Sequence, residues 1–144
     1  MTLIVKTVAR IVAGFILLFG IYIVIHGHVS PGGGFAGGII IALSFLLIML
    51  AFGKELILKK VSMSIFSSFE SLGAVLLLAI ALAGFLGGYF FLNFFTNKGC
   101  PFRVFNAGII PLCNIVISLK VGVGLLAIFV VLIILKSTTE KDGK

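Results

Sequence analysis

The chain has no tryptophan, three prolines, two cysteines and only four acidic residues among its 144 residues. Charged residues make up 10% of it and hydrophobic residues 61%, with a mean hydropathy of +1.37. A soluble domain is usually about one quarter charged, so this composition leaves too little polar surface to cover a globule in water. It excludes an ordinary soluble protein and indicates an integral membrane protein.

Alternation of polar and apolar residues is also missing, which argues against a β-barrel. The apolar runs are continuous instead, and a helix needs about 20 such residues to cross a bilayer. They predict one all-α transmembrane domain over residues 1–136, an integral membrane four-helix bundle with a Gly-rich break between its first two helices. The helices are expected at about 7–25, 35–52, 69–91 and 115–135, followed by a charged cytoplasmic tail at 137–144.

The basic residues outnumber the acidic ones and give the chain a net charge of +7. They flank the apolar runs, as membrane-edge anchors do, so no nucleic-acid partner is expected. Most fall on the side that would hold both termini: Lys6, Arg10, Lys54, Lys59, Lys60, Lys136, Lys141 and Lys144. Since cytoplasmic segments carry the excess of lysine and arginine, both termini are expected in the cytoplasm, in a multi-pass protein of the cell membrane.

Metal and redox chemistry find little support in the sequence. Cys100 and Cys113 are too few, and too far from other ligand types, for a structural metal site, so no metal and no cofactor are expected. Two reduced, packed thiols are favoured over a disulfide. A nucleophile with a neighbouring base is also missing, so the chain is not expected to be an enzyme by itself.

The segment 26–38, HGHVSPGGGFAGG, separates the first two apolar runs. Gly32, Gly34 and Gly37 match the spacing of a dinucleotide fingerprint, but that motif needs a preceding strand, and here a proline between membrane helices precedes it. Irregular backbone at membrane depth must be enclosed by protein or line a wet cavity. A structural packing role is therefore expected, with an ion or water path as the alternative. The residues assigned to it are Pro31, Gly32, Gly33, Gly34, Gly37 and Gly38.

Small residues recur every four positions in the second and third runs, which lets helix backbones approach closely. They include Gly34 and Gly38 in the second run, and Ala79, Ala83 and Gly87 in the third. A chain of four helices has few internal contacts to use all these faces, so some are expected to face other subunits.

Four titratable residues in or beside the spans are candidates for an ion path: His26, His28, Glu70 and Lys120. A carboxylate at the position of Glu70 is costly unless paired or hydrated, although it could also simply favour the helix N-terminus. Glu70 is expected near the cytoplasmic start of the third helix and Lys120 near the outer end of the fourth, so no direct pair is expected. The histidines could relay protons or form interfacial hydrogen bonds. Asn106, Pro111 and Asn114 are expected to break the chain before Lys120.

Several of these segments together resemble the MnhB/MrpB family, the B subunits of multisubunit sodium/proton antiporters. They are the segment 26–38, FESLG at 69–73, GIIPL at 108–112, Asn114 and LKVG at 119–122. The resemblance runs from about residue 7 to residue 135. The Ser-Pro-Gly-Gly-Gly-Phe motif within it is specific, whereas the apolar remainder is not.

The resemblance implies a non-catalytic membrane subunit of a cation (Na⁺)/proton antiporter module. Its partners would be other small and large subunits, the lipid bilayer, and Na⁺ and H⁺. The same module occurs in membrane-bound hydrogenases and sulfur-reducing respiratory complexes, and the sequence does not separate these alternatives. By motif match, an ion-path role would carry over to Glu70, Lys120, His26 and His28. A purely structural packing subunit is the further alternative.

Overall fold

The computed structural model describes residues 3–29, 32–53, 63–89, 91 and 108–142, without the side chains of residue 63 and of 137–142. These residues contain no strand and form four helices: α1 (Leu3–Ile25), α2 (Gly33–Phe52), α4 (Met63–Leu86) and α5 (Ile110–Asp142). Each helix contains a stretch that is long and apolar enough to cross a membrane. The predicted all-α membrane architecture is confirmed.

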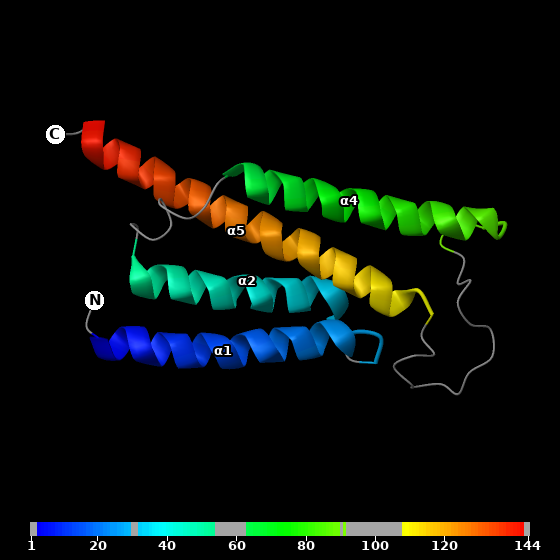
Figure 1. The fold of residues 1–144 in the computed structure, drawn as a ribbon, viewed down its shortest axis with the longest axis horizontal. Helices are drawn as coiled ribbons and strands as arrows, with labels where there is room; N and C mark the ends of the chain where they lie inside the picture. Colours follow the sequence, from blue (N-terminus) through cyan, green and yellow to red (C-terminus); the bar gives the residue numbers. More distant parts are fainter. Residues whose placement is uncertain (1–2, 30–31, 54–62, 90, 92–107, 143–144) are drawn as a thin grey trace.

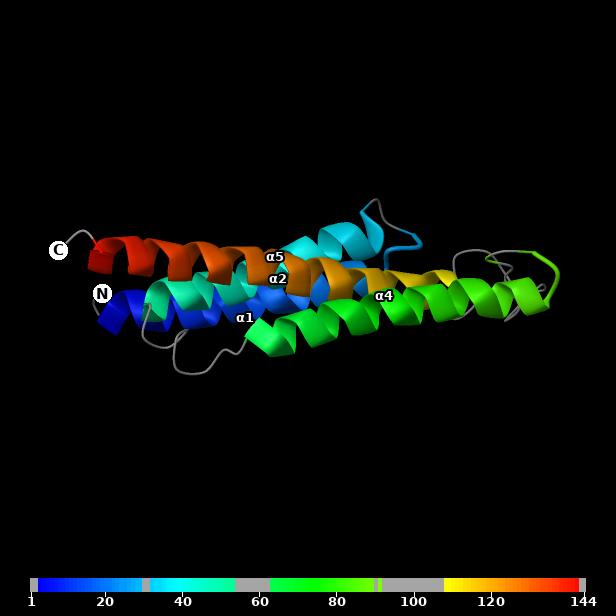
Figure 2. The ribbon, with the colours of Figure 1, turned by 90° about the horizontal axis from the view of Figure 1, so that it is seen from above.

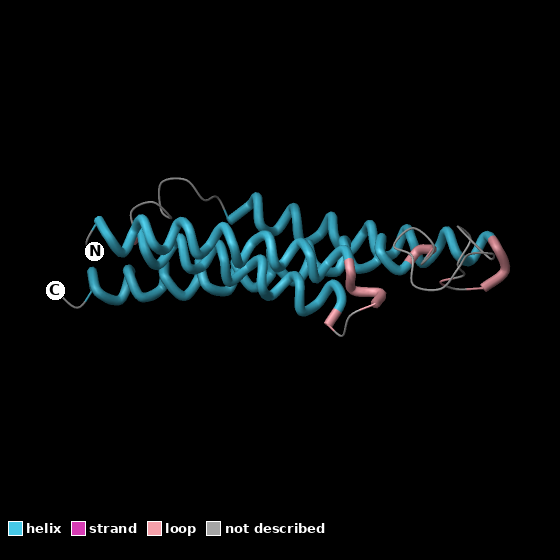
Figure 3. Tube along the Cα trace, turned by 90° about the horizontal axis from the view of Figure 1, so that it is seen from below, coloured by secondary structure: helices cyan, strands magenta, loops and turns pink. Residues whose placement is uncertain are grey.

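The helices lie side by side in the order α1, α2, α5, α4 (Figure 1). α1 and α2 form an antiparallel hairpin, α2 and α5 run parallel, and α4 packs chiefly on α5. The start of α1 and the end of α5 lie at the same end of the long axis of the molecule, as Figure 3 also shows. An even number of spans requires that arrangement. The cytoplasmic location of this end stays a prediction.

Helix α4 is displaced along the long axis of the molecule, away from the end that holds the termini (Figures 1 and 2). Its first turns lie beside the middle of α5, not beside the end of α5. A residue in the first turns of α4 therefore lies level with the middle of α5, not with the end of α5.

The contacts of α2 with its neighbours are made by small side chains. The buried residues of α2 are all small: Gly34, Gly37, Gly38, Ala42, Ser44 and Ala51. Large apolar side chains on all four helices are exposed instead, among them Phe15, Phe35, Leu78 and Leu132. Lipid solvates such side chains well, so association of membrane helices depends on the close backbone contact that small residues permit.

The third span differs from its expected range at both ends. α4 begins at Met63, whereas the sequence suggested about residue 69, because the serines in its first turns are tolerated in a helix whose start needs no long apolar run. It ends at Leu86, where Gly87 and Gly88 turn the chain with N–H groups bonded to the carbonyls of Gly84 and Phe85.

The fourth span also begins earlier than expected. α5 starts at Ile110, and Pro111 lies in its first turn, where the missing N–H has no helical partner to lose. The helix then continues through Asn114, so the break expected at Pro111 and Asn114 is absent. Asn106, the third residue of that expected break, lies outside the described residues.

Candidate functional site

The glycine-rich segment makes a sharp entry into α2. Gly32 has a φ of 124° and Gly33 a φ of 52°, backbone angles that residues other than glycine rarely adopt. The Ala36 N–H already donates to the Gly32 carbonyl at 3.2 Å, so the helix begins directly after this turn. Pro31 lies outside the described residues, and no strand precedes the turn in the part of the chain that the structure describes.

Helix α2 then contacts α5 backbone to backbone. A Cβ atom on Gly34 would overlap the carbonyl of Asn114, and one on Gly38 would lie 2.7 Å from the carbonyl oxygen of Ser118. One turn further along α5, a Cβ on Gly122 would lie 3.3 Å from the Gly38 carbonyl oxygen. Glycines on α2 thus fit against a row of residues spaced by four on α5.

That row on α5, formed by Asn114, Ser118 and Gly122, is fully buried. The small residues named from the sequence lie in the second and third apolar runs, so this row on α5 was not predicted. The four-residue spacing of small or polar side chains within an apolar run is the signal that would have found it.

The opposite side of α2 packs on α1 in the same manner. A Cβ on Gly37 would lie 3.1 Å from the backbone nitrogen of Val24 and 3.2 Å from the carbonyl oxygen of Gly20. α2 is therefore held between two neighbouring helices, and its first turns are enclosed by protein.

Asn114 joins the start of α2 to α5 by a side-chain hydrogen bond. The Gly34 N–H donates to Asn114 Oδ1 at 3.3 Å, which satisfies one of the free donors of the α2 N-terminus. The amide Nδ2 of Asn114 is buried and has no hydrogen-bond partner among the described residues. A buried donor of this kind is normally satisfied by an ordered water or a neighbouring group.

The two candidate histidines have different surroundings. The His26 ring stacks on Tyr22 with centroids 4.3 Å apart, and its Nδ1 lies 3.2 Å from the Tyr22 carbonyl oxygen. Since a carbonyl only accepts, that bond requires a proton on Nδ1. Both ring nitrogens of His28 are buried, and the part of the chain that the structure describes offers them no hydrogen-bond partner. His26 is thus held by its own helix, whereas His28 has its polar atoms enclosed and unsatisfied.

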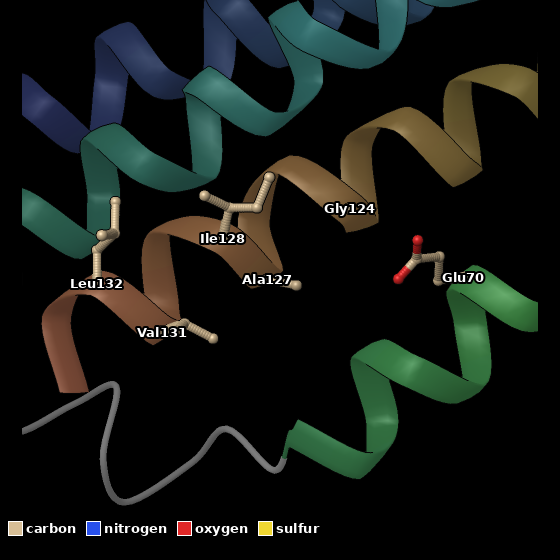
Figure 4. A pocket seen from close by; sticks show the side chains of 6 residues that line it. All are labelled: Glu70, Gly124, Ala127, Ile128, Val131 and Leu132. Atoms are coloured by element: carbon tan, nitrogen blue, oxygen red, sulfur yellow. The ribbon is translucent and has the colours of Figure 1, made fainter. Parts of the chain in front are cut away.

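Glu70 lies on α4 and lines a groove of about 350 Å³ against α5. Its carboxylate points into the space between the two helices, toward the small residues Gly124 and Ala127 (Figure 4). Ile128, Val131 and Leu132 complete the lining. The side chain itself is exposed in the isolated chain. The groove is therefore an open apolar channel along α5 with one carboxylate at its edge.

Glu70 lies in the first turns of α4, but α4 as a whole is displaced along α5 (Figure 1). Gly124, which faces Glu70 across the groove, lies near the middle of the α5 span Ile110–Lys136. Glu70 is therefore level with the middle of the α5 span, although it is only about 10 Å from the start of α4 at 1.5 Å per residue. The displacement of α4 along the row of helices accounts for the difference.

Lys120 lies near Glu70, not at the opposite depth. A Cβ on Gly73 would be 3.2 Å from the Cβ of Lys120, so α4 and α5 nearly touch here. Gly73 follows Glu70 by three residues and shares its helix face. The expectation that the two residues sit at opposite depths was wrong, because each depth was counted along its own helix and the offset of α4 was not visible in the sequence. The expectation of no direct pair between them stays a prediction.

The groove offers a single carboxylate and apolar walls. Within the described residues, Glu70 has no hydrogen bond or ion pair, and no three histidine, cysteine, aspartate or glutamate side chains come together as a metal-binding group. Such a carboxylate can take up a proton, pair with a basic side chain, or contribute one oxygen ligand to a cation whose other ligands come from water or another chain.

The remaining sequence candidates lie away from this groove. Cys113 is a free thiol packed against the cluster of Ile80, Ile109 and Val116, and Cys100 lies outside the described residues. On α4, Gly73 and Gly84 are buried, whereas Ala79 and Gly87 are exposed. The Ala79–Gly87 row therefore does not serve the contact with α5.

Comparisons with known proteins agree with this architecture. Residues 4–127 match the profile of a domain related to the MnhB subunit of Na⁺/H⁺ antiporters. The chain is 38% identical to the uncharacterized protein MJ1307 of Methanocaldococcus jannaschii, over 99% of this chain and 56% of the relative. It is 38% identical to a putative antiporter subunit mnhB2 of Staphylococcus epidermidis, over 53% of each protein. The chain thus spans little more than half the length of these relatives.

A solved structure also resembles the chain. It is that of the membrane-bound sulfane sulfur reductase, an archaeal respiratory membrane complex, with a TM-score of 0.76 and 36% sequence identity. The match covers 89% of this chain and 56% of the other. Since the family profile covers most of the four-helix unit and its Gly-rich entry into α2, the chain belongs to the MnhB family and is a multi-pass membrane protein.

Proposed function

We propose that the chain is a non-catalytic membrane subunit of a cation (Na⁺)/proton antiporter module, and that Glu70 contributes to its ion path. The observation that carries the proposal is the position of Glu70, near mid-depth at the edge of an apolar groove. An ionisable residue at that depth is costly and typically marks an ion or proton pathway. The MnhB relationship supports sodium and protons as the transported ions.

Assembly with other subunits is the second part of the proposal. α4 packs chiefly on α5, and the described residues leave the Glu70 groove open along α5. The putative antiporter subunits among the relatives and the respiratory complex both support a place in a larger membrane assembly. In such an assembly, neighbouring small and large subunits would cover this side of the chain, in the cell membrane, with both termini in the cytoplasm.

The assembly could also be a respiratory complex, since the structural relative is a sulfane sulfur reductase. Purification of the native assembly through an affinity tag on this chain separates the two. Nickel or iron–sulfur absorbance in the purified complex would favour the hydrogenase or sulfur-reducing alternative. A complex without such centres that exchanges sodium for protons would favour the antiporter.

The ion-path role is tested by Glu70→Gln in the assembled complex, with Na⁺-dependent proton exchange measured in inverted vesicles. We expect the rate to fall about tenfold or more, equivalent to about 1.4 kcal/mol or more, because the amide neither ionises nor binds a proton. Ser71→Ala is the control, since the Ser71 hydroxyl bonds only the Ser67 carbonyl of its own helix.

Normal exchange in both Glu70→Gln and Lys120→Met, with normal amounts of assembled complex, would contradict the ion-path role. The chain would then be a packing subunit. In that case Gly38→Leu, which inserts a side chain into the α2–α5 contact, should still abolish assembly.

A further inference from the structure

Glu70 of α4 and Lys120 of α5 lie beside the same close contact between the two helices. Glu70 is the only acidic residue and Lys120 the only basic residue in the segments 64–86 and 110–135. Each segment belongs to a helix that can cross the membrane. The three atoms nearest to the place of a Cβ on Gly73 are the Cβ, Cα and backbone nitrogen of Lys120, at 3.2–3.6 Å.

Gly73 makes this approach possible. Because Gly73 has no side chain, the α5 backbone at Lys120 packs closely against it, and a Cβ at residue 73 would lie 3.5 Å from the Lys120 Cα. A larger residue would hold the helices apart. Gly73 is buried, whereas Glu70 and Lys120 are both exposed on the isolated chain, so their side chains are free to turn toward one another beside the Gly73 contact.

The distance between the two side chains can be bounded. Residues three apart on one helix face have Cβ atoms about 5–6 Å apart. With the 3.2 Å from residue 73 to Lys120, the Cβ atoms of Glu70 and Lys120 are at most about 9 Å apart. A lysine ammonium extends about 5 Å beyond its Cβ and a glutamate oxygen about 3 Å. The two groups therefore reach hydrogen-bonding distance by rotation of side chains alone.

Membrane energetics favour that rotation. Within the described residues neither charge has a hydrogen bond or an ion pair. An isolated charge near the bilayer centre is costly, and such charges are usually paired. The nearest opposite charge available to each residue within these two helices is the other one.

We propose that Lys120 is the counter-ion of Glu70 and competes with the transported cation for its carboxylate. This inference rests on the proposed function for the role of the cation, but not for the pair itself. When no cation is present, the Lys120 ammonium donates to the Glu70 carboxylate and the groove is electrically neutral. A cation or a proton that reaches Glu70 displaces the ammonium, which then swings away along α5. Gly73 is the positioning residue that holds the two helices close enough.

The pair is tested by a double-mutant cycle on the tagged, assembled complex, with the thermal melting midpoint as the readout. Glu70→Gln and Lys120→Met should each lower the midpoint by about 2–4 °C, because each leaves one charge unpaired. The double variant should lose no more than the worse single variant. Glu70→Lys with Lys120→Glu should regain most of the midpoint that either reversal loses alone.

Lys136 provides the matched control, since it is a lysine on the same helix at the far end of the α5 span. Glu70→Gln and Lys136→Met should have additive effects. Additive effects for Glu70 and Lys120 as well would overturn the proposed pair. As a second test, Gly73→Val should abolish the coupling between Glu70 and Lys120 by separating the helices.

Vesicle transport separates this inference from the proposed function. If the pair competes with the cation, Lys120→Arg should retain exchange while it changes the sodium concentration at half-maximal rate. Coupled midpoints with normal exchange in Glu70→Gln would support the pair and contradict the ion path. Additive midpoints with exchange lost in Glu70→Gln would contradict the pair and leave the ion path standing.

Discussion

Two glycines of this chain show that the meaning of a residue depends on what faces it. Gly14 on α1 has nothing within 4 Å of the place where a Cβ would stand. Gly38 on α2 has the carbonyl oxygen of Ser118 at 2.7 Å from that place. Both lie in apolar helices, so the sequence around them does not tell an open site from a backbone contact.

Alanine at these two glycines should therefore have opposite effects. Gly38→Ala should lower the free energy of unfolding by about 1–3 kcal/mol, because α2 and α5 must move apart. Gly14→Ala should leave it unchanged or raise it by up to about 1 kcal/mol, because alanine is the better helix former. Unfolding of the purified protein in mixed micelles measures both. Equal effects at the two positions would contradict the packing argument.

Asn114 shows how a polar residue can be structural within an apolar helix. Asn114→Leu keeps the approximate volume but removes the acceptor for the Gly34 N–H. The free energy of unfolding should fall by about 1–3 kcal/mol, the usual cost of leaving a buried donor unsatisfied.

Ser118→Ala is the control for Asn114→Leu, in the same micelle assay. The Ser118 hydroxyl bonds the Ile115 carbonyl of its own helix at 2.8 Å, so its loss should cost less than about 1 kcal/mol. A loss at Ser118 as large as that at Asn114 would show that the contact between α2 and α5 does not depend on the Asn114 bond.

At the level of the helices, cation–π contacts join α1 to α2. The start of α1 meets the end of α2, where Lys6 Nζ lies 5.8 Å and Arg10 Cζ 5.4 Å from the centre of the Phe52 ring. These contacts join the hairpin at the end of the molecule where the termini lie, opposite the Gly-rich turn. Both ends of the α1–α2 hairpin are thereby tied.

Removing the aromatic ring should loosen this end of the hairpin. Phe52→Leu should lower the free energy of unfolding by about 0.5–1 kcal/mol per cation that loses its ring. Phe45→Leu is the control, because Phe45 is an exposed phenylalanine of the same helix. The effect of Phe52→Leu should shrink when Arg10 is already methionine. An unchanged effect in that background would exclude Arg10 as a contributor.

At the scale of the whole molecule, the four helices lie side by side, with the start of α1 and the end of α5 at one end of the long axis (Figure 1). The basic residues of this end predict that it faces the cytoplasm. Green fluorescent protein fused after Lys144 should fluoresce in cells, and alkaline phosphatase fused there should be inactive. Phosphatase fused at residue 97, between α4 and α5, should be active. The reverse pattern would place the termini outside and would contradict the predicted orientation.

Much of this architecture could be predicted because it depends on composition and on residues close in sequence. Four apolar runs with few charges specify four membrane helices, and the run of Gly32, Gly33 and Gly34 predicts the tight entry into α2. The boundaries of α4 and α5 were less predictable, since serines and a first-turn proline are compatible with both helix and loop.

The site was predicted only in part. The sequence singled out Glu70 and Lys120 because charges in apolar runs are rare, but it separated them in depth. Their proximity follows from the displacement of α4 and from the close approach at Gly73. The α5 row that faces the α2 glycines, formed by Asn114, Ser118 and Gly122, was not predicted either, although its four-residue spacing is visible in the sequence.

The sequence by itself determined that this is a four-helix membrane protein with a Gly-rich turn and the motifs of the MnhB family, because hydropathy and local backbone preference act within each segment. Only the tertiary structure decided that Glu70 and Lys120 lie beside the same contact between α4 and α5. The offset between two helices depends on how their surfaces fit, and the close approach of Gly73 to Lys120 is one of the contacts that join these distant segments. Such a long-range contact has no counterpart in hydropathy or periodicity, yet it brings Glu70 and Lys120 within reach of each other.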